Sequence, residues 1–382
     1  MRILYATNFN YKRCGKYYSH SWTKFQHSLI RSGHYVYPFS LNDMMRLRSP
    51  FGHNAFGARG MNRGLIKAVR NVEPDVLLLV QGKQVTVDTL ATVRAEYPAM
   101  RIAYAWLDAV WEGAPTYGLE ERLPLVDSFF LSTAGRRLEA YAGPGRVTAY
   151  IPNPVEATID RHRAFECESP EYDLVFFGSD DAPRNEILRE IRRRLPHVRC
   201  GFFGCLGNDP VFGIAKEKIL ARSRMAINLS RRNDVALCSS NRLGDTTANG
   251  LLNFIDAATG LQALYRPGDG EQPGEAVYFH STDDLIAKID HYHRHDDERI
   301  AVARAGWSRA HNDFAAEGIS EFILGATFRS EGYDDIPWPR FICEDAARKR
   351  WDGHLLPDSD RTARVAQEAK VAKTLRASHA AA

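Results

Sequence analysis

Metal-binding and disulfide patterns are lacking in this sequence. Its six cysteines are scattered, form no CxxC pair and have no histidine partner at the spacing of metal ligands. Neither a disulfide framework nor a zinc site is therefore indicated, and the cysteines are typical of reduced thiols in the cytoplasm. Because no group of Asp, Glu, His or Cys has ligand spacing, we also expect no metal cofactor.

The chain also lacks a strong excess of charge of one sign. Its 382 residues include 50 Lys and Arg against 47 Asp and Glu, which gives a formal net charge of +3. Proteins that bind nucleic acids usually carry a clear basic excess. We therefore expect no nucleic-acid partner and favour a small molecule.

Long apolar runs are absent. No run approaches the length of a membrane-spanning helix, and the N-terminal stretch MRILYATNFN turns polar too early for a signal peptide. These features predict a cytoplasmic protein. Residues 361–382 place Val365, Val371 and Leu375 among cations, which would allow a weak contact with the cytoplasmic surface of the inner membrane. The apolar face is thin, however, and favours a solvated tail.

Short apolar runs alternate with segments of helical periodicity in both halves of the chain. The expected strands are 2–6, 75–80, 101–106, 128–131, 147–151, 172–178, 198–204, 225–230, 251–255 and 276–279. The expected helices are 21–33, 86–98, 183–195, 281–293, 296–311 and 317–328. Alternation of this kind predicts parallel sheets covered by helices on both faces. The fold class is therefore α/β, with two doubly wound Rossmann-like domains facing a cleft.

A proline-containing segment, IPNPVE (151–156), separates the two halves, because two prolines around an asparagine prevent a helix from continuing. We predict a first domain over residues 1–152 and a second over residues 153–330. Residues 331–382 are expected to form a helical extension and tail.

The segment CSSNRLGDTTANG (238–250) is too polar for a core and lies between two predicted strands. It leads into a short helix, whose first N–H groups and positive end suit a phosphate or pyrophosphate, and Arg242 adds a fixed cation with bidentate geometry. Asp245, one turn later, could accept hydrogen bonds from two sugar hydroxyls. The alternative is a solvated loop capped by Ser240 or Asn241, with Arg242 and Asp245 as a surface pair. Composition alone favours neither.

The order of these residues resembles a known family. A strand, Asn241-Arg242, an acid three residues later, a closing glycine and an apolar strand resemble the donor-binding segment of GT-B glycosyltransferases, in the group-one and spore-maturation-protein-like branch. The resemblance includes LVFFGSDDAPRNEIL (174–188), YIPNPVE (150–156) and residues 274–314, and it is weak over the first half. The family usually has glutamate where this chain has Asp245, and a shorter carboxylate changes the reach.

The resemblance implies transfer of a sugar from a nucleotide-sugar donor to a hydroxyl of a cell-surface glycan or lipid-linked saccharide of the lipopolysaccharide or capsule type. It also implies a last helix, at about residue 344, that crosses back to the first domain. The donor-binding residues would be Gly178, Ser179, Arg184, Ser239, Ser240, Asn241, Arg242 and Asp245. Protein cations, Arg242 above all, would stabilise the leaving phosphate without a metal.

Other cations near this segment have simpler interpretations. Arg184 lies in the first turn of a helix whose other arginines are expected to face solvent. A solvated position is therefore favoured slightly over donor binding for Arg184. Lys216 and Lys218 belong to a helix with alternating charges, a pattern that usually faces water.

The first domain offers candidates for acceptor binding and catalysis. They come from the long loop after the first strand and from AWLDAVWEG (105–113), and comprise Asn8, Asn10, Tyr17, His20, Trp106 and Trp111. Asp108 would end a strand at the cleft and could remove the proton from the acceptor hydroxyl. His20 is otherwise a structural residue at a helix start, and Asp108 otherwise caps a turn.

Two other functions remain open. A nucleotide-sugar epimerase would need additional acid and base residues around the anomeric carbon of the donor. A catalytically silent nucleotide- or carbohydrate-binding protein would need no base in the first domain. The fold alone does not separate these alternatives.

Overall fold

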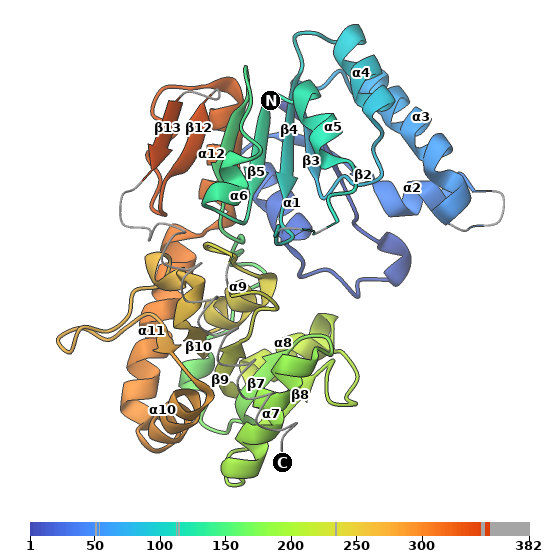
Figure 1. Cartoon of the computed structure of the whole chain (residues 1–382). Coiled ribbons are helices and arrows are strands. Elements are labelled where there is room, and N and C mark those ends of the chain that lie inside the picture. Colours follow the sequence, from blue (N-terminus) through green and yellow to red (C-terminus); the bar gives the residue numbers. More distant parts are fainter. Residues whose placement is uncertain are drawn as a thin grey trace, which may run out of the picture.

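The computed structural model of the chain describes residues 1–49, 52, 54–111, 113, 115–233, 235–344 and 348–351. Two β-sheets organise it, one of eight strands and one of five. In Figure 1 the larger sheet and its helices form the upper part of the molecule, and the smaller sheet lies below it. The predicted fold class, with two parallel Rossmann-like sheets, is confirmed.

The first sheet contains six parallel strands followed by an antiparallel pair at one edge. The parallel strands are β1 (Arg2–Thr7), β2 (Tyr35–Ser40), β3 (Val76–Val80), β4 (Arg101–Trp106), β5 (Ser128–Leu131) and β6 (Val147–Tyr150). The order is β13-β12-β6-β5-β4-β3-β1-β2. All residues of β3 and β5 are buried, as expected for strands covered on both faces.

Helices connect the parallel strands. They are α1 (Ser21–Arg31), α2 (Leu41–Leu47), α3 (Asn54–Val72), α4 (Val87–Glu96), α5 (Leu119–Arg122) and α6 (Arg136–Glu139), with 3-10 turns at Tyr11–Arg13 and Leu123–Leu125. Strand β2 is not among the expected strands. It contains Pro38, and as an edge strand it tolerates the missing proline N–H. None of the helices in the described ranges is long and apolar enough to cross a membrane.

The second sheet is entirely parallel, in the order β11-β10-β9-β7-β8. Its strands are β7 (Tyr172–Phe177), β8 (Cys200–Phe203), β9 (Ser223–Asn228), β10 (Leu252–Asp256) and β11 (Val277–Phe279). Its helices are α7 (Ala182–Arg194), α8 (Gly213–Ala221), α9 (Asn241–Ala248), α10 (Thr282–Arg294) and α11 (Asp296–Asp313), and 3-10 turns lie at Ala164–Glu166, Ala257–Thr259 and Leu261–Ala263.

The chain passes between the sheets twice, and the two passages lie side by side. The stretch between β6 and β7, which contains the predicted boundary at 152/153, forms a bridge at Val155 with Ala315. Helix α12 (Ala316–Phe328) then returns to the first sheet, where Figure 1 shows it in orange beside β5. Its hydroxyl groups bond to that domain, with Ser320 Oγ 2.7 Å from Ser28 Oγ and Thr327 Oγ1 2.7 Å from Ser128 Oγ.

The described part of the C-terminal extension is not the predicted helix. Strands β12 (Phe341–Glu344) and β13 (Arg348–Trp351) extend the first sheet, and β12 runs antiparallel to β6. The physical reason is the edge of β6, whose backbone groups need partners that the buried segment Phe341–Glu344 supplies. Residues 345–347 and 352–382, which include the predicted tail, lie outside the described residues.

In both sheets the strand order reverses between the first and third strands. The reversal falls between β1 and β3 in the first sheet and between β7 and β9 in the second. Open α/β sheets bind ligands beyond the carboxyl ends of strands at such switch points. We therefore expect ligand-binding residues directly after β1, β3, β7 and β9.

Candidate active site

Arg242 lies across the switch point of the second sheet. Its Nη1 donates to the Phe177 carbonyl at 2.9 Å, and Nη2 donates to the Leu229 carbonyl at 2.8 Å. Nε and Nη2 also donate to Asn228 Oδ1, at 3.2 and 3.0 Å. Phe177 ends β7, and Asn228 ends β9. The guanidinium is thus fixed where the fold predicts a ligand.

The sequence predicts bidentate anion binding by Arg242, and the structure changes that expectation. The four hydrogen bonds to protein acceptors occupy four of the five N–H groups of the guanidinium. One N–H on Nη1 remains for a ligand. In this arrangement Arg242 would act on an anion by its charge and one hydrogen bond.

The charge of Arg242 has no carboxylate partner among the described residues. Burial, followed by the neighbouring Arg184, lowers the pKa of Arg242 to about 9. Arg184 is only 6% exposed, so its predicted solvated position is wrong. Its Nη2 donates to the Ser179 carbonyl at 2.9 Å, and Asp181 lies 3.5 Å from its Nε. Among the described residues only Arg184 of these two neighbouring buried arginines has a carboxylate nearby, and such an excess of buried positive charge favours an anionic ligand.

Helix α9 begins beside this pair. Ser240 is its N-cap and accepts a hydrogen bond from the Leu243 N–H, which confirms the predicted short helix. Ser239 is buried and accepts from Asn153 Nδ2 at 2.9 Å. The Asn241 side chain accepts a hydrogen bond from Ser21 of α1, so the first domain contacts the start of the helix.

A cavity of about 420 Å³, here named the Phe203 cavity, lies on one side of Arg242. Its apolar wall consists of Phe177, Phe203, Pro210, Val211 and Phe212, and its polar side includes Lys16, His20, Gly178, Ser179, Lys216, Asn241, Arg242 and Asp245. A Cβ on Gly178 would lie 2.6 Å from the Phe176 ring and 3.3 Å from Arg242 Nη1. Glycine therefore keeps this side of the cavity open next to the guanidinium.

A second cavity of about 560 Å³, here named the Trp106 cavity, also borders Arg242 and, like the Phe203 cavity, has walls from both domains. The first domain contributes Lys83, Trp106, Leu107, Asp108, Ala109, Trp111, Pro115 and Tyr117. The second contributes Gly178, Ser179, Arg184, Leu229, Ser230, Arg231, Arg232, Cys238, Ser239, Ser240, Asn241 and Arg242. Because Gly178, Ser179, Asn241 and Arg242 line both cavities, the two meet at Arg242.

The structure brings Asp108 and Arg242 to this one cavity from opposite domains. The Asp108 side chain is 57% exposed and accepts from Lys83 Nζ at 2.9 Å. Lys83 in turn lies over the rings of Trp106 and Tyr117, at 5.1 and 4.6 Å from their centroids. The carboxylate is therefore oriented by a cation on an aromatic surface, and its role as a base stays a prediction.

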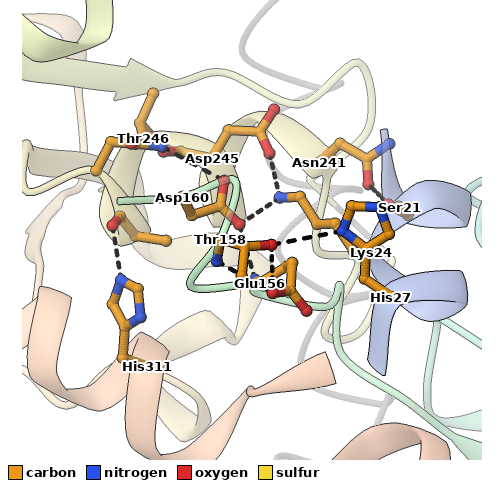
Figure 2. A network of polar contacts seen from close by, with 12 residues as sticks. Ser21, Lys24, His27, Glu156, Thr158, Asp160, Asn241, Asp245, Thr246 and His311 are labelled. Carbon is orange, nitrogen blue, oxygen red and sulfur yellow. Dashed lines mark hydrogen bonds and ion pairs between the residues drawn. The ribbon is translucent and has the colours of Figure 1, made fainter. Parts of the chain in front are cut away.

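Asp245 is buried in an ion-pair network between the domains (Figure 2). Lys24 of α1 reaches out of the first domain and places its Nζ 2.7 Å from Asp160 Oδ2 and 2.8 Å from Asp245 Oδ1. Lys216 pairs with the other oxygen of Asp245. Burial alone would raise the pKa of Asp245, but the two lysines lower it to about 2. Asp245 lines the Phe203 cavity with both oxygens already paired, which restricts the ribose contact that the resemblance implies.

The sequence predicts part of this network wrongly and gives no prediction for another part. Lys216 is not the surface residue that its charge pattern predicts, whereas Lys218 is exposed as predicted. Lys24, only 2% exposed, was not identified at all. The signal was present, because Lys24 shares the buried face of α1 with Ser21, Phe25 and Ser28 at helical spacing. The partners of Lys24 lie more than 130 residues away, where no local pattern indicates them.

The predicted acceptor residues do not form one group. Asn10, Tyr17 and His20 line a depression of about 260 Å³ together with Lys12, Arg13, Trp22, Asn42 and Arg46, here named the Lys12 depression. Trp111 and the edge of Trp106, which is only 2% exposed, line the Trp106 cavity instead. Asn8 lines none of the three and holds the loop by accepting from Gln84 Nε2 at 3.2 Å.

His20 lies between the Lys12 depression and the Phe203 cavity. It is the N-cap of α1 but makes no capping hydrogen bond with its side chain. Burial lowers the pKa of His20 to about 4, so its imidazole is neutral at neutral pH. Its ring stacks on Trp22, with centroids 4.2 Å apart.

Comparison with known families and structures gives the following matches. Residues 184–325 match a family model described as glycosyl transferase-like. The catalytic domain of starch synthase IV from Arabidopsis thaliana, bound to ADP and acarbose, has a TM-score of 0.59 at 10% identity, covering 86% of this chain and 99% of that chain. The Anabaena protein Alr3699/HepE in complex with UDP-glucose has a TM-score of 0.52 at 10% identity, covering 86% and 100%.

The chain has the GT-B fold. A putative UDP-N-acetylglucosamine 2-epimerase from Listeria monocytogenes is similar as well, with a TM-score of 0.51 at 11% identity over 87% of this chain and 98% of that chain. At such identities the likeness establishes the fold and leaves activity to the site. A comparison with curated protein sequences gives no match.

The sequence predicts no cluster of metal ligands, and on this point the structure differs. Among the described residues, His291, His295 and Glu298 hold their ligand atoms within 4.8 Å of one another. All three are exposed at the junction of α10 and α11 and line none of the three cavities named above. His291 and His295 are four residues apart, and His295 and Glu298 are three apart, a helical spacing that could have indicated this cluster from the sequence.

Proposed function

We propose that the protein is a glycosyltransferase that moves a sugar from a nucleotide-sugar donor to a hydroxyl of an acceptor. The observation that carries this proposal is the position of Arg242, a buried cation without a carboxylate partner in the described residues, at the junction of two cavities. A nucleoside diphosphate sugar has the matching order of parts: an aromatic base, an anionic pyrophosphate and a sugar.

The linings of the two cavities differ, and each suits a different part of a nucleotide sugar. The apolar wall of the Phe203 cavity suits a nucleobase, and the Trp106 cavity combines aromatic rings with polar groups, which suits a sugar and an acceptor hydroxyl. The glycosyl transferase-like match over residues 184–325 supports this assignment, as do the ADP and UDP-glucose bound to the two structurally similar proteins.

The mechanism follows from the charges at the junction. When the bond between sugar and phosphate breaks, negative charge grows on the β-phosphate, and fixed donors in a cavity that excludes water stabilise it. In this proposal Arg242, Arg184 and the N–H groups at the start of α9 would be those donors. Asp108, held by Lys83 on the facing domain, would accept the proton of the attacking hydroxyl.

The proposal extends to the acceptor and to the place of the reaction in the cell. The acceptor would be a hydroxyl of a cell-surface glycan or lipid-linked saccharide, of the lipopolysaccharide or capsule type, and the reaction would take place in the cytoplasm or at the cytoplasmic face of the inner membrane. The segments 150–156, 174–188 and 274–314, which resemble the spore-maturation-protein-like branch, support these points.

Thermal-shift measurements with UDP, GDP, CMP and ADP sugars test the donor. A ligand that binds the native state raises the apparent stability, so we expect one nucleotide series to raise the thermal midpoint. Incubation with that donor and an acceptor mixture should then release nucleoside diphosphate and form a glycoside. A donor that is isomerised at one sugar carbon and not transferred would identify an epimerase instead. No stabilisation by any nucleotide would contradict the proposal.

We further propose that transfer needs no divalent metal, because the buried cations Arg184 and Arg242 line the Trp106 cavity, next to which the leaving phosphate would lie. Activity should persist in excess EDTA, within about twofold of the untreated enzyme. The control is the same assay after addition of Mg²⁺ or Mn²⁺. Loss of activity with EDTA that returns on adding either ion would show that arginines alone do not stabilise the leaving group.

A further inference from the structure

The Lys12 depression lies beyond the carboxyl end of the first sheet, beside its switch point. The 3-10 turn Tyr11–Arg13 follows β1, and Asn42 and Arg46 belong to α2, which begins directly after β2. In the described part of the chain, the side-chain ammonium of Lys12 and the guanidinium of Arg13 form no hydrogen bond or ion pair. The depression therefore presents two cations to a ligand.

The nearby carboxylate, Asp43, is used to hold the loop. It accepts from the Tyr11 N–H at 2.8 Å and from the Lys12 N–H at 3.4 Å, and the Ser40 hydroxyl also donates to it. It forms no ion pair with Lys12 or Arg13 among the described residues. Among the described residues, neither Lys12 nor Arg13 therefore has an ion-pair partner.

Amide groups and aromatic rings complete the lining. Asn42 Nδ2 donates to Asn10 Oδ1 at 3.3 Å, and Gln84 Nε2 donates to Asn42 Oδ1 at 2.9 Å, so the amides are fixed in a chain. Tyr17 and Trp22 supply rings. Rings that stack on sugar faces and amides that bind hydroxyls are the groups expected at a saccharide site.

Two polar atoms of the lining also lack partners. Nδ1 of His20 and Nε1 of Trp22 are buried and have no hydrogen-bond partner among the residues that the structure describes. Buried polar atoms are normally satisfied, and an atom left without a partner costs free energy, so these two point to a group that the free protein does not contain. The depression is therefore incomplete as well as cationic.

We propose that the Lys12 depression binds the acceptor and that this acceptor is a saccharide bearing an anionic group, a phosphate or a carboxylate. The inference rests on the proposed function, because His20 borders both this depression and the Phe203 cavity, so a saccharide held here would lie next to the donor. Lys12 and Arg13 bind the anionic substituent, at a distance from the hydroxyl that reacts.

Binding of three matched probes to the full-length protein tests the inference. Glucose 6-phosphate and glucuronic acid carry the two anionic groups, and glucose carries neither. Ligand-observed NMR titrations should show at least tenfold tighter binding of one or both charged probes than of glucose, weakening as salt is added. The tighter of the two charged probes identifies phosphate or carboxylate as the group recognised.

Variants locate the binding. The double variant Lys12→Gln/Arg13→Gln should weaken binding of the charged probe at least tenfold and leave nucleotide affinity within twofold. The matched control is Arg63→Gln/Lys67→Gln, which removes two exposed cations from α3 of the same domain and should change neither affinity. Circular dichroism and thermal midpoints establish that both variants are folded.

Equal affinity for charged and neutral probes would overturn the inference, and so would probe binding that the double variant leaves unchanged. A loss of nucleotide affinity in the double variant would also overturn it, because Lys12 and Arg13 would then belong to the donor site. A different result separates it from the proposed function. If no nucleotide binds but glucose 6-phosphate binds through Lys12 and Arg13, the transferase proposal fails and an anionic-saccharide site remains.

Discussion

Arg242 combines two roles that the sequence alone does not separate. As a solvent-facing phosphate ligand it could be removed without cost to stability, yet its guanidinium is tied to the ends of β7 and β9. Arg242→Ala leaves buried carbonyl and amide acceptors unpaired, so we expect a loss of about 1–3 kcal/mol in unfolding free energy. Nucleotide affinity should fall at least tenfold in the same variant.

Denaturant unfolding and calorimetry with the preferred nucleotide measure these two effects. The matched control is Arg189→Ala, an exposed arginine on α7, which should change neither. Full nucleotide affinity in folded Arg242→Ala would remove Arg242 from the donor site.

Asp108 offers a cleaner separation of binding from chemistry, because its side chain is mostly exposed and contributes little to the core. Asp108→Asn keeps the shape and removes the basic oxygen. Transfer should fall by a factor on the order of a hundred or more, the usual scale of general-base catalysis, while nucleotide affinity persists. Steady-state transfer rates and calorimetry measure both quantities. Unchanged transfer would make Asp108 a turn residue only, and a mild loss would suit an acceptor contact in a retaining enzyme.

Gly178, in the turn between β7 and α7, lines both cavities. Gly178→Ala would place a methyl group against the Phe176 ring and next to Arg242 Nη1, so the ring or the guanidinium must move. We expect a loss of about 1–3 kcal/mol in stability, as for other overpacked sites, and weaker nucleotide binding. Thermal unfolding and nucleotide titration test this prediction.

A matched control lies in α12. A Cβ on Gly318 meets no atom within 4 Å, so Gly318→Ala should stabilise the helix by about 0.5–1 kcal/mol and leave nucleotide binding unchanged. Equal nucleotide affinity in both glycine variants would show that Gly178 does not shape the site.

Most elements could be predicted because they depend on local patterns. The buried strands at 75–80 and 128–131 and the helix at 183–195 follow directly from apolar runs, helical periodicity and a proline at the helix start. Strand β2 contains a proline and depends on its place at a sheet edge, whereas β12 depends on its pairing with β6, far away in the sequence. The sequence reveals neither.

The candidate site also has parts that could be predicted from the sequence and parts that could not. The segment 238–250 could be located from its polarity between two strands, and it does carry Arg242 to the switch point. The pairing of Asp245 with Lys24 and Lys216, and the aromatic wall around Phe203, bring together residues from separate segments. Such contacts are products of tertiary packing, and a single sequence without a family pattern for them gives no signal.

At the scale of the whole molecule, Lys24 is a buried cation of the first domain that pairs with two carboxylates of the second. In Lys24→Ala the buried carboxylate of Asp160 would lose its cation, and Asp245 would keep only Lys216. Breaking a buried pair in this way typically costs about 3–5 kcal/mol. Because separation of the domains would return both carboxylates to water, we expect a more open molecule. Small-angle X-ray scattering should show a larger radius of gyration.

Lys67→Ala, which removes an exposed lysine of α3, is the control for loss of one charge and should leave the radius of gyration unchanged. Lys24→Arg, which keeps the cation, should give a value closer to the wild type. An unchanged radius in folded Lys24→Ala would show that apolar packing between the domains, and not this ion pair, holds them together.

The return of α12 and β12 to the first sheet affects the order in which the chain can fold during synthesis. Strands β1 to β6 leave the ribosome first, but the surface that α12 covers and the edge that β12 pairs with stay exposed until residues 316–344 have been made. At about 5–20 residues per second, synthesis of residues 151–315 takes roughly ten to thirty seconds. The second sheet and its helices are contiguous between β7 and α11 and can be completed within that interval. The domain that begins the chain is therefore the last to be finished, and a nascent chain stalled before α12 would present an apolar sheet surface to chaperones.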